Sequence, residues 1–171
     1  MQIQAGPCVL RLWRADDLDA LLRHADNAAI ARNLRDAFPH PYTRADGEFW
    51  LSLAAQIDPP LHFAIEHEGE AVGGIGMIPG KDVERVSAEV GYWLGERVWG
   101  RGLATAAVRA LVAHAFATTE LTRLFALPFA DNAASRRVLE KAGFHLEGLL
   151  RKSAIKQGRI VDQALYGCIR E

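Results

Sequence analysis

The sequence has little cysteine, little net charge and no long apolar run, and each shortage excludes a class of protein. Cys8 and Cys168 are the only cysteines, and neither has a partner at metal-ligand spacing, so we expect reduced thiols and no metal site. The net charge is −1, with basic and acidic residues interleaved, which argues against nucleic-acid binding. No apolar run approaches the roughly 20 residues that cross a bilayer, and the first residues do not resemble a signal peptide. We therefore expect a cytoplasmic protein that does not bind membranes.

The 171 residues, of which 50% are hydrophobic, suit one globular domain with a sizeable core. We find no internal repeat and no interdomain linker, so we expect a single domain over residues 1–171. Apolar periodicity and turn residues predict an α/β fold, a mixed sheet with helices on both faces. The expected strands are 9–13, 61–66, 71–78, 86–94, 124–127, 145–151 and 163–169, and the expected helices are 15–26, 28–34, one that begins after Thr43, 103–118 and one that begins near Asn132.

The segment from Glu89 to Thr105 carries the clearest functional signal, because it runs from a strand into a helix through glycines. Gly100 and Gly102 allow a tight turn and close approach of a ligand, and the first amides of the next helix suit a phosphate or pyrophosphate. A nucleotide P-loop would need a lysine and then a serine or threonine after Gly102. A dinucleotide fingerprint would need a third small residue at Thr105 and an early strand. Neither pattern is present.

This order of pieces resembles the GNAT superfamily of acetyl-CoA-dependent N-acetyltransferases, whose motif is Gln/Arg-x-x-Gly-x-Gly/Ala between a strand and a helix. One register places Trp99, Gly102 and Ala104 on the motif, and the other places Arg97, Gly100 and Gly102. We prefer the first, which puts Gly102 at the helix start and is similar to the ribosomal-protein (Rim-type) branch. The run from Asn132 to Phe144 resembles the superfamily's Asn-x-x-Ser/Ala helix that ends in Gly-Phe. The resemblance implies a GNAT-like, mostly antiparallel sheet.

The resemblance also implies a set of cofactor-binding residues. Trp93 and Leu94 would offer main-chain groups to the pantetheine arm and the acetyl carbonyl, and Asn132 would bond the pantetheine amides, although Asn132 also suits a plain helix cap. The remaining expected contacts of acetyl-CoA lie in and beside the glycine loop, mainly through its backbone: Arg97, Val98, Trp99, Gly100, Arg101, Gly102, Leu103, Ala104 and Thr105.

Two residues are candidates for catalysis. Glu89 interrupts a mostly apolar strand just before the glycine loop, so we expect it to take the proton from the acceptor ammonium, directly or through water. A solvent-facing strand glutamate is the alternative. Many GNAT enzymes protonate the leaving thiolate with a tyrosine, but the matching position here is Leu139. The Rim-type branch instead implies Ser135 near the sulfur.

We therefore expect an N-acetyltransferase in which a primary amine, on a protein N-terminus or a small molecule, attacks the thioester directly. Neither Cys8 nor Cys168 is expected to lie near the motifs, which argues against a covalent enzyme intermediate. Acceptor recognition is expected in residues 26–42 and 152–162, with Tyr42, Trp50 and Tyr166 as lining candidates. The resemblance is also compatible with a homodimer. A module that binds acyl-CoA without turnover is the alternative function, motivated by Leu139.

Overall fold

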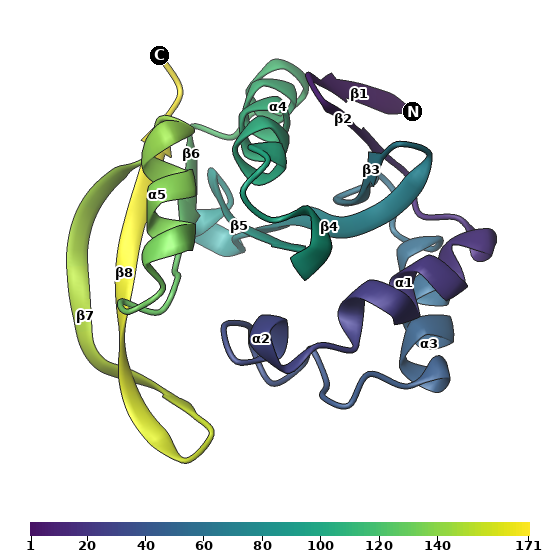
Figure 1. The fold of residues 1–171 in the computed structure, drawn as a ribbon. Coiled ribbons are helices and arrows are strands. Elements are labelled where there is room, and N and C mark those ends of the chain that lie inside the picture. Colours follow the sequence, from purple (N-terminus) through teal and green to yellow (C-terminus); the bar gives the residue numbers. More distant parts are fainter.

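The computed structural model describes all 171 residues and contains one sheet of eight strands with helices on both faces (Figure 1). This arrangement confirms the predicted α/β class. In chain order the strands are β1 (Gln2–Ala5), β2 (Cys8–Arg11), β3 (His62–His67), β4 (Glu70–Pro79), β5 (Ser87–Leu94), β6 (Arg123–Ala126), β7 (His145–Lys156) and β8 (Arg159–Ile169).

The strands lie in the order β1-β2-β3-β4-β5-β6-β8-β7, and every neighbouring pair is antiparallel except β5 and β6. The parallel pair is short. Residues Ser87 to Glu89 lie opposite Arg123 to Phe125, and beyond Glu89 the ladder between the two strands stops. The sheet thus consists of two antiparallel parts joined by a parallel seam. We call the space where the strands part the gap between β5 and β6.

Helices from different parts of the chain cover the two faces of the sheet (Figure 1). One face carries α4 (Leu103–Thr118) and α5 (Ala133–Lys141), and the other carries α1 (Leu18–Ala25) and α3 (Arg44–Ala54). We call the second one the α1–α3 face. The remaining helical elements are α2 (Ala28–Ala31) and three 3-10 turns, η1 (Ala15–Asp17), η2 (Asp82–Glu84) and η3 (Glu96–Val98).

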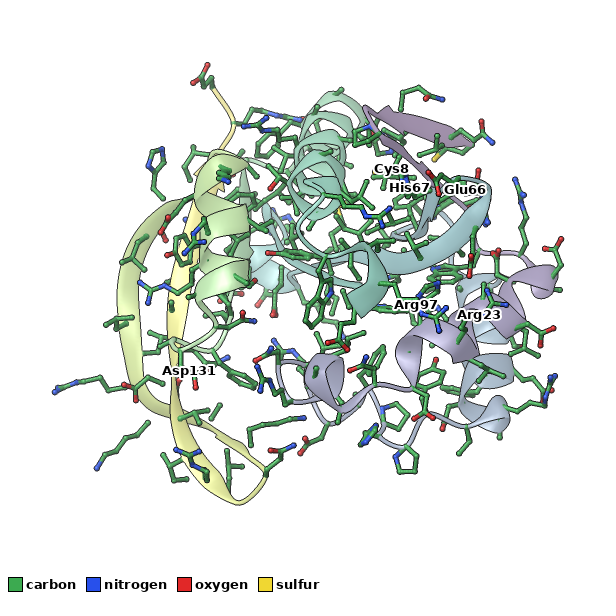
Figure 2. The ribbon with its side chains drawn as sticks, in the orientation of Figure 1. Cys8, Arg23, Glu66, His67, Arg97 and Asp131 are labelled. Carbon is green, nitrogen blue, oxygen red and sulfur yellow. The ribbon has the colours of Figure 1, made fainter.

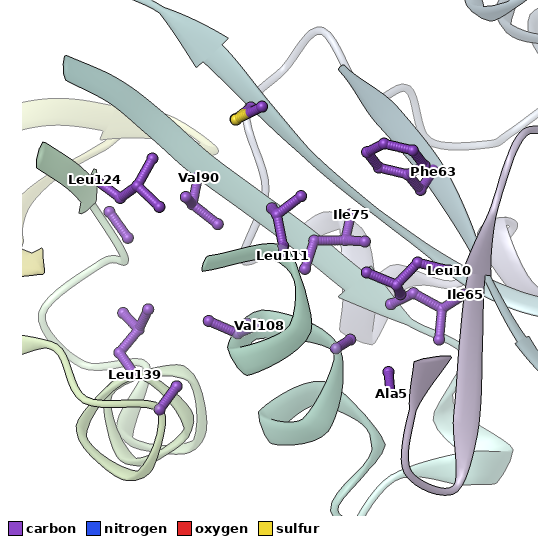
Figure 3. Packing of buried hydrophobic residues seen from close by; sticks show 14 of the residues in the cluster. Ala5, Leu10, Phe63, Ile65, Ile75, Val90, Val108, Leu111, Leu124 and Leu139 are labelled. Carbon is purple, nitrogen blue, oxygen red and sulfur yellow. The ribbon is translucent and has the colours of Figure 1, made fainter. Parts of the chain in front are cut away.

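The larger hydrophobic core lies between the sheet and the helices α4 and α5 (Figure 3). Val108 and Leu111 of α4 and Leu139 of α5 are fully buried there. They face sheet residues such as Val90 and Leu124, which alternate with residues of the opposite face because successive side chains of a strand point to opposite sides. The core therefore fixes the position of the loop that leads into α4.

The smaller core lies on the α1–α3 face and is rich in aromatic side chains. It contains Trp13, Leu21 and Tyr42, with Trp50 and Trp93 packed against it. A buried ion pair sets the start of the helices on this face, because the guanidinium of Arg11 on β2 donates two 2.7 Å hydrogen bonds to the carboxylate of Asp17 at the end of η1. The guanidinium of Arg11 also contacts the carboxylate of Glu66 on β3.

Several predicted boundaries are wrong, while α4 begins and ends at the predicted residues. The strand predicted at 9–13 is Cys8–Arg11, and β1 before it was not predicted, because it has only four residues, two of them glutamine, and pairs only through the hairpin with β2. The helix predicted at 28–34 ends at Ala31. The last two strands are longer than predicted, since their exposed distal part, 151–162, forms a twisted hairpin that lacks a strong apolar alternation.

Candidate active site

The loop between β5 and α4, residues 95–102, leaves the sheet at the open edge of the gap. Gly100 and Gly102 have φ values of +74° and +77°, a region that other residues rarely adopt. A Cβ atom added to either glycine would meet nothing within 4 Å, so the backbone conformation, and not crowding within the protein, calls for glycine. Gly102 is the N-cap of α4, and no side chain caps the helix. The first amides of α4 are therefore free to bind an anion beside this loop.

Helix α4 begins at Leu103, with Gly102 as its N-cap. The preferred alignment of the motif, with Trp99, Gly102 and Ala104, assumed this helix start. Two of the side chains expected to accompany this loop do not face solvent, because Val98 and Leu103 are buried in the core. Only their backbone groups can serve a ligand. Arg97 and Arg101 are exposed, and neither forms an ion pair with the protein.

The main chain of β5 offers hydrogen-bonding groups to the gap at alternate residues. Gly95 N–H donates to the carbonyl of Val72 and Gly80 N–H donates to the carbonyl of Ser87, so the odd-numbered residues of β5 pair with β4. By this alternation Trp93 faces β4, whereas Tyr92 and Leu94 turn their main-chain groups toward the gap. The alternation favours Tyr92 and Leu94 over Trp93 as main-chain partners of a ligand in the gap.

The indole of Trp99 closes the loop onto the end of β5. Its Nε1–H donates a 2.8 Å hydrogen bond to the carbonyl of Leu94, while 46% of the residue remains exposed. One of the two main-chain groups that Leu94 turns toward the gap is therefore already used. The amide of Leu94 is the group that remains for a ligand.

Across the gap, Tyr92 of β5 meets the first turn of α5. Its hydroxyl lies 2.8 Å from the Oγ of Ser135 and also donates to the Ser135 carbonyl at 3.2 Å. Burial raises the pKa of Tyr92 to about 12, although the hydrogen bond with Ser135 acts in the opposite direction. Asn132 caps α5 by accepting a 3.2 Å hydrogen bond from the Ser135 amide, while its side-chain nitrogen has no partner in the protein. The predicted cap is thus confirmed, and a donor of Asn132 remains for a ligand.

Leu139 occupies the position where the resemblance expects a tyrosine. It is fully buried in the larger core and has no polar atom to offer. Tyr166 cannot replace it and cannot line an acceptor site, which corrects the prediction for this residue. Tyr166 is fully buried, accepts a hydrogen bond from Arg136 and donates one to Glu140. Tyr92 is therefore the tyrosine nearest to Ser135, and its place opposite α5 could not be found from sequence spacing.

Glu89 lies on the α1–α3 face, at the last paired position of the parallel seam. Its carboxylate forms an ion pair with the guanidinium of Arg35, and its side chain is 24% exposed. Glu89 is therefore neither a free solvent-facing glutamate nor a deeply buried one. The partner was not predicted, because Arg35 lies 54 residues earlier in the chain, in the segment after α2.

The same face carries aromatic walls around a floor of glycines. Direct cross-strand pairs put Gly74 beside Trp93 and Gly76 beside Gly91. The Trp93 ring packs against Phe38 with centroids 5.4 Å apart. Of the two other predicted lining residues, Tyr42 is buried and Trp50 is half-buried.

The two segments predicted to recognise the acceptor meet in the structure. Lys156 at the end of β7 donates a 2.8 Å hydrogen bond to the carboxylate of Asp36, 120 residues away in the chain. Because Arg35 also binds Glu89, the segment after α2 lies between the sheet and the β7–β8 hairpin. This location supports a role in covering the site.

A polar cavity of about 270 Å³ lies beside the loop. Its lining includes Arg97 of η3 and Arg23 near the end of α1, both of which are labelled in Figure 2. Arg97 and Arg23 lie next to each other there, and the side chain of Asn27 donates a 2.7 Å hydrogen bond to Glu96. Arg23 and His24 both contact the carboxylate of Glu70. Arg23 is thus paired with a carboxylate, whereas Arg97 in the same cavity has no carboxylate within ion-pair distance.

One prediction about the cysteines needs correction. Cys8 lies close to the candidate site, because its thiol is 3.9 Å from the carbonyl of Leu103 at the start of α4. Sequence distance concealed this contact, since 95 residues separate the two positions. Cys8 is only 3% exposed, and burial raises the pKa of its thiol, so it does not present a thiolate nucleophile. Both cysteines are free.

Comparison with known proteins identifies the class of protein that this fold and site define. Residues 8–145 match the Acetyltransferase (GNAT) domain family, and the chain therefore belongs to the GNAT acetyltransferases. No helix is long and apolar enough to span a membrane, and no three histidine, cysteine, aspartate or glutamate side chains are grouped as metal ligands.

Individual relatives support the Rim-type branch. The chain is 33% identical to the uncharacterized N-acetyltransferase p20 of Bacillus licheniformis over 122 residues, 70% of this chain and 66% of p20. It is 34% identical to the ribosomal-protein-serine acetyltransferase of Escherichia coli over 107 residues, 63% of this chain and 59% of that protein. The chain thus spans less than two thirds of the length of these relatives. RimJ of Mycobacterium smegmatis, solved with a CoA disulfide, shares 27% identity at a TM-score of 0.84, covering 99% of this chain and 86% of that one.

Proposed function

We propose that this protein is an acetyl-CoA-dependent N-acetyltransferase that acetylates a primary amine by direct attack on the thioester. The observation that carries the proposal is the gap between β5 and β6. The uncapped first turn of α4 lies at one end of it, and the Tyr92–Ser135 pair lies across it. Family membership and the CoA-bound relative support the same donor.

The residues present fit acetyl-CoA. The open space around Gly100 and Gly102 leaves room for a pyrophosphate beside the α4 amides, and Arg97 and Arg101 would add unpaired positive charge. The exposed edge of β5 at Tyr92 and Leu94 would bind an extended pantetheine arm as an added strand is bound. Asn132 would donate its free side-chain N–H groups to the same arm.

When bound, acetyl-CoA supplies the activated acetyl group, and the protein supplies the proton transfers and the orientation. Glu89 takes a proton from the acceptor ammonium, directly or through water, once the acceptor has displaced Arg35. The amide of Leu94 binds the acetyl carbonyl, and Ser135 donates a hydrogen bond to the departing thiolate. Cys8 and Cys168 take no part.

We propose a protein N-terminus as the acceptor, because one relative is named a ribosomal-protein-serine acetyltransferase. A small amine is the alternative acceptor. We also propose that the protein forms a homodimer and is cytoplasmic. The proposed reaction involves no nucleic acid, membrane or metal ion. The rival function, an acyl-CoA-binding module without turnover, is favoured only by the apolar side chain of Leu139.

The test is to incubate the protein with acetyl-CoA and a panel of peptides and amines, and to measure free CoA and acetylated product by mass spectrometry. We expect CoA release that depends on an acceptor and is accompanied by one acetylated product. Tight acetyl-CoA binding without either product would favour the binding module. Weak or absent binding of acetyl-CoA would overturn both functions. The Glu89→Gln protein is the matched control, since it should bind acetyl-CoA but turn over slowly.

A further inference from the structure

His62 lies on the α1–α3 face, and its ring nitrogens have no hydrogen-bond partner in the protein. It is the first residue of β3 and is paired with Gly76 of β4, which in turn is paired with Gly91 of β5. A Cβ atom on Gly76 would collide with the Nδ1 atom of His62. The imidazole therefore leans over β4 in the direction of β5.

The space beyond the imidazole is open. A Cβ atom on Gly91 would meet nothing within 4 Å, and Gly91 is exposed. Neighbouring strands lie about 4.8 Å apart, so a ring above Gly76 is about one strand spacing from the space above Gly91. The rings of Trp50 and His62 pack at a steep angle of 76°, with centroids 5.4 Å apart. A single water molecule above Gly91 can therefore reach the imidazole.

Glu89 borders the same space. It lies two residues before Gly91 on β5, so its side chain points to the same face of the sheet. The charged groups here are Glu89 from β5 and Arg35 from the segment after α2, while β4 contributes glycines and Ile78, and α3 contributes Trp50. His62 and Glu89 are thus the two titratable proton acceptors beside the open position above Gly91.

The free energy of proton transfer favours a second acceptor. The ordinary pKa is about 7.8 for an α-ammonium and about 4.3 for a glutamate. Proton transfer from the ammonium to a carboxylate alone is therefore unfavourable by roughly 3.5 pKa units. An ordinary histidine, at about 6.5, would recover roughly 2 of those units. Burial lowers the pKa of His62 from 6.5, so its imidazole is neutral at pH 7, and the gain is smaller than the one that an ordinary histidine would give.

We propose that His62 is the terminal proton acceptor of this face, receiving through water above Gly91 the proton that leaves the acceptor amine by way of Glu89. The proposal rests on the proposed acetyltransferase function. In the transfer the ammonium gives one proton to the Glu89 carboxylate, which passes it to the neutral imidazole. Glu89 is then ionised again, His62 carries the positive charge, and the neutral amine attacks the thioester carbon. As the C–S bond breaks, the nitrogen loses its second proton and the departing thiolate takes up one proton, so the products are the amide and the CoA thiol. Solvent later takes the proton from the imidazolium.

The experiment compares kcat of the wild-type protein, His62→Gln and His62→Ala across pH, with a fixed acceptor and saturating acetyl-CoA. For His62→Gln we expect at least a tenfold loss of kcat and an unchanged Kd for acetyl-CoA. The wild-type rate should fall as the pH decreases through the lowered pKa of His62, and the His62→Gln rate should not show this step. Added imidazole should restore the rate of His62→Ala in a dose-dependent way, because the deleted ring leaves space above Gly76. His145→Gln and His145→Ala, made at an exposed position on β7, are the matched controls and should show neither effect.

The result that overturns the role of His62 is a His62→Gln protein with wild-type kcat and pH profile. A rate loss that imidazole does not restore, with an unmoved pH profile, also overturns it by showing a structural effect. Wild-type turnover tests the proposed function separately, because it involves no substitution. If the wild-type protein turns over no acceptor, both the proposed function and the role of His62 are overturned. If the wild-type protein turns over normally and the His62 variants give either of these contrary results, only the role of His62 is overturned.

Discussion

The hydroxyl groups of Tyr92 and Ser135 lie 2.8 Å apart, although one residue belongs to β5 and the other to α5 across the gap. The pair could supply either a proton or a hydrogen bond to a thiolate leaving group. Full transfer from a phenol with a pKa of about 12 to a thiolate, whose ordinary pKa is about 8.5, is uphill by roughly 3.5 units, or about 5 kcal/mol. Hydrogen-bond donation by Ser135, with Tyr92 as its support, is therefore the expected role.

Ser135→Ala should lower kcat and leave the Kd for acetyl-CoA almost unchanged. A hydrogen bond to a charged group contributes about 1.5–3 kcal/mol, which corresponds to a loss of roughly 10- to 150-fold if it forms only as the thiolate leaves. Steady-state kinetics and direct binding measure the two effects. Weaker binding at unchanged kcat would instead assign Ser135 to ground-state binding of pantetheine. No change in either would remove Ser135 from the site.

Tyr92→Phe should have a smaller effect of the same kind. The substitution removes a neutral hydrogen bond worth about 0.5–1.5 kcal/mol, so kcat should fall roughly 2- to 12-fold. In the wild type, the raised pKa keeps the Tyr92 hydroxyl protonated through neutral and mildly alkaline pH, so Tyr92 should add no step to the pH profile below about pH 11. In Ser135→Ala, the further change Tyr92→Phe should cost little, since the two act together. Fully additive losses would contradict a shared role.

Gly102→Val should weaken acetyl-CoA binding by an order of magnitude or more. Valine disfavours the φ of +77° at the N-cap, and its side chain would project into the open space where the pyrophosphate is expected. Calorimetry measures the affinity, and circular dichroism checks that the variant is folded. Gly158→Val provides the control, because it places the same strain, at φ +75°, in the distant β7–β8 turn. A folded Gly102→Val protein with unchanged affinity would refute the assignment of this loop.

Glu89→Gln should lose roughly 100- to 10,000-fold in turnover while it retains acetyl-CoA binding. Part of the lost rate should return as pH rises, because more of the acceptor amine is then neutral without help from the protein. A pH series of kcat with one acceptor measures the recovery. Full activity of Glu89→Gln at neutral pH would transfer the role to water or to another group.

Arg35→Gln should raise kcat/KM for the acceptor by up to about fivefold. The Arg35–Glu89 ion pair is partly exposed, with 65% of the arginine side chain and 24% of the glutamate side chain accessible, and surface ion pairs contribute about 0–1 kcal/mol. An acceptor ammonium that binds Glu89 must displace this guanidinium, so its removal lowers that cost. The effect should shrink at high salt, which screens the pair. A large loss of activity would show that Arg35 binds the acceptor instead of competing with it.

The sequence was sufficient for the elements with strong local signals. Helix α4 was predictable because Gly102 stops the preceding turn and an alanine-rich run follows, and the Asn132 cap was predictable because it acts within one turn. Contacts between distant segments carry no local pattern. The pairs Arg35–Glu89, Tyr92–Ser135 and Cys8–Leu103 depend on how the strands are ordered in the sheet, and only the structure reveals them.

The strand alternation also explains a limit in predicting main-chain contacts. The sequence indicates that β5 borders the cofactor, but whether Trp93 or its neighbours face the gap depends on which residues bond to β4. A change of one residue in that register would exchange the two sets. The identity of the side chains gives no information about this register.

The short parallel seam divides the chain as well as the sheet. Strands β1 to β5 come from residues 2–94 and β6 to β8 from residues 123–169, so each antiparallel part is one continuous stretch of sequence. Glu89 and Tyr92 belong to the first stretch, and Asn132 and Ser135 to the second. The site is therefore an internal interface between two halves, and a ligand in the gap would act as a clamp that resists their separation. At a ligand concentration of 100 times its Kd, such a clamp would add about 2.7 kcal/mol to the free energy of unfolding, which makes the heat resistance of this protein a function of its cofactor supply.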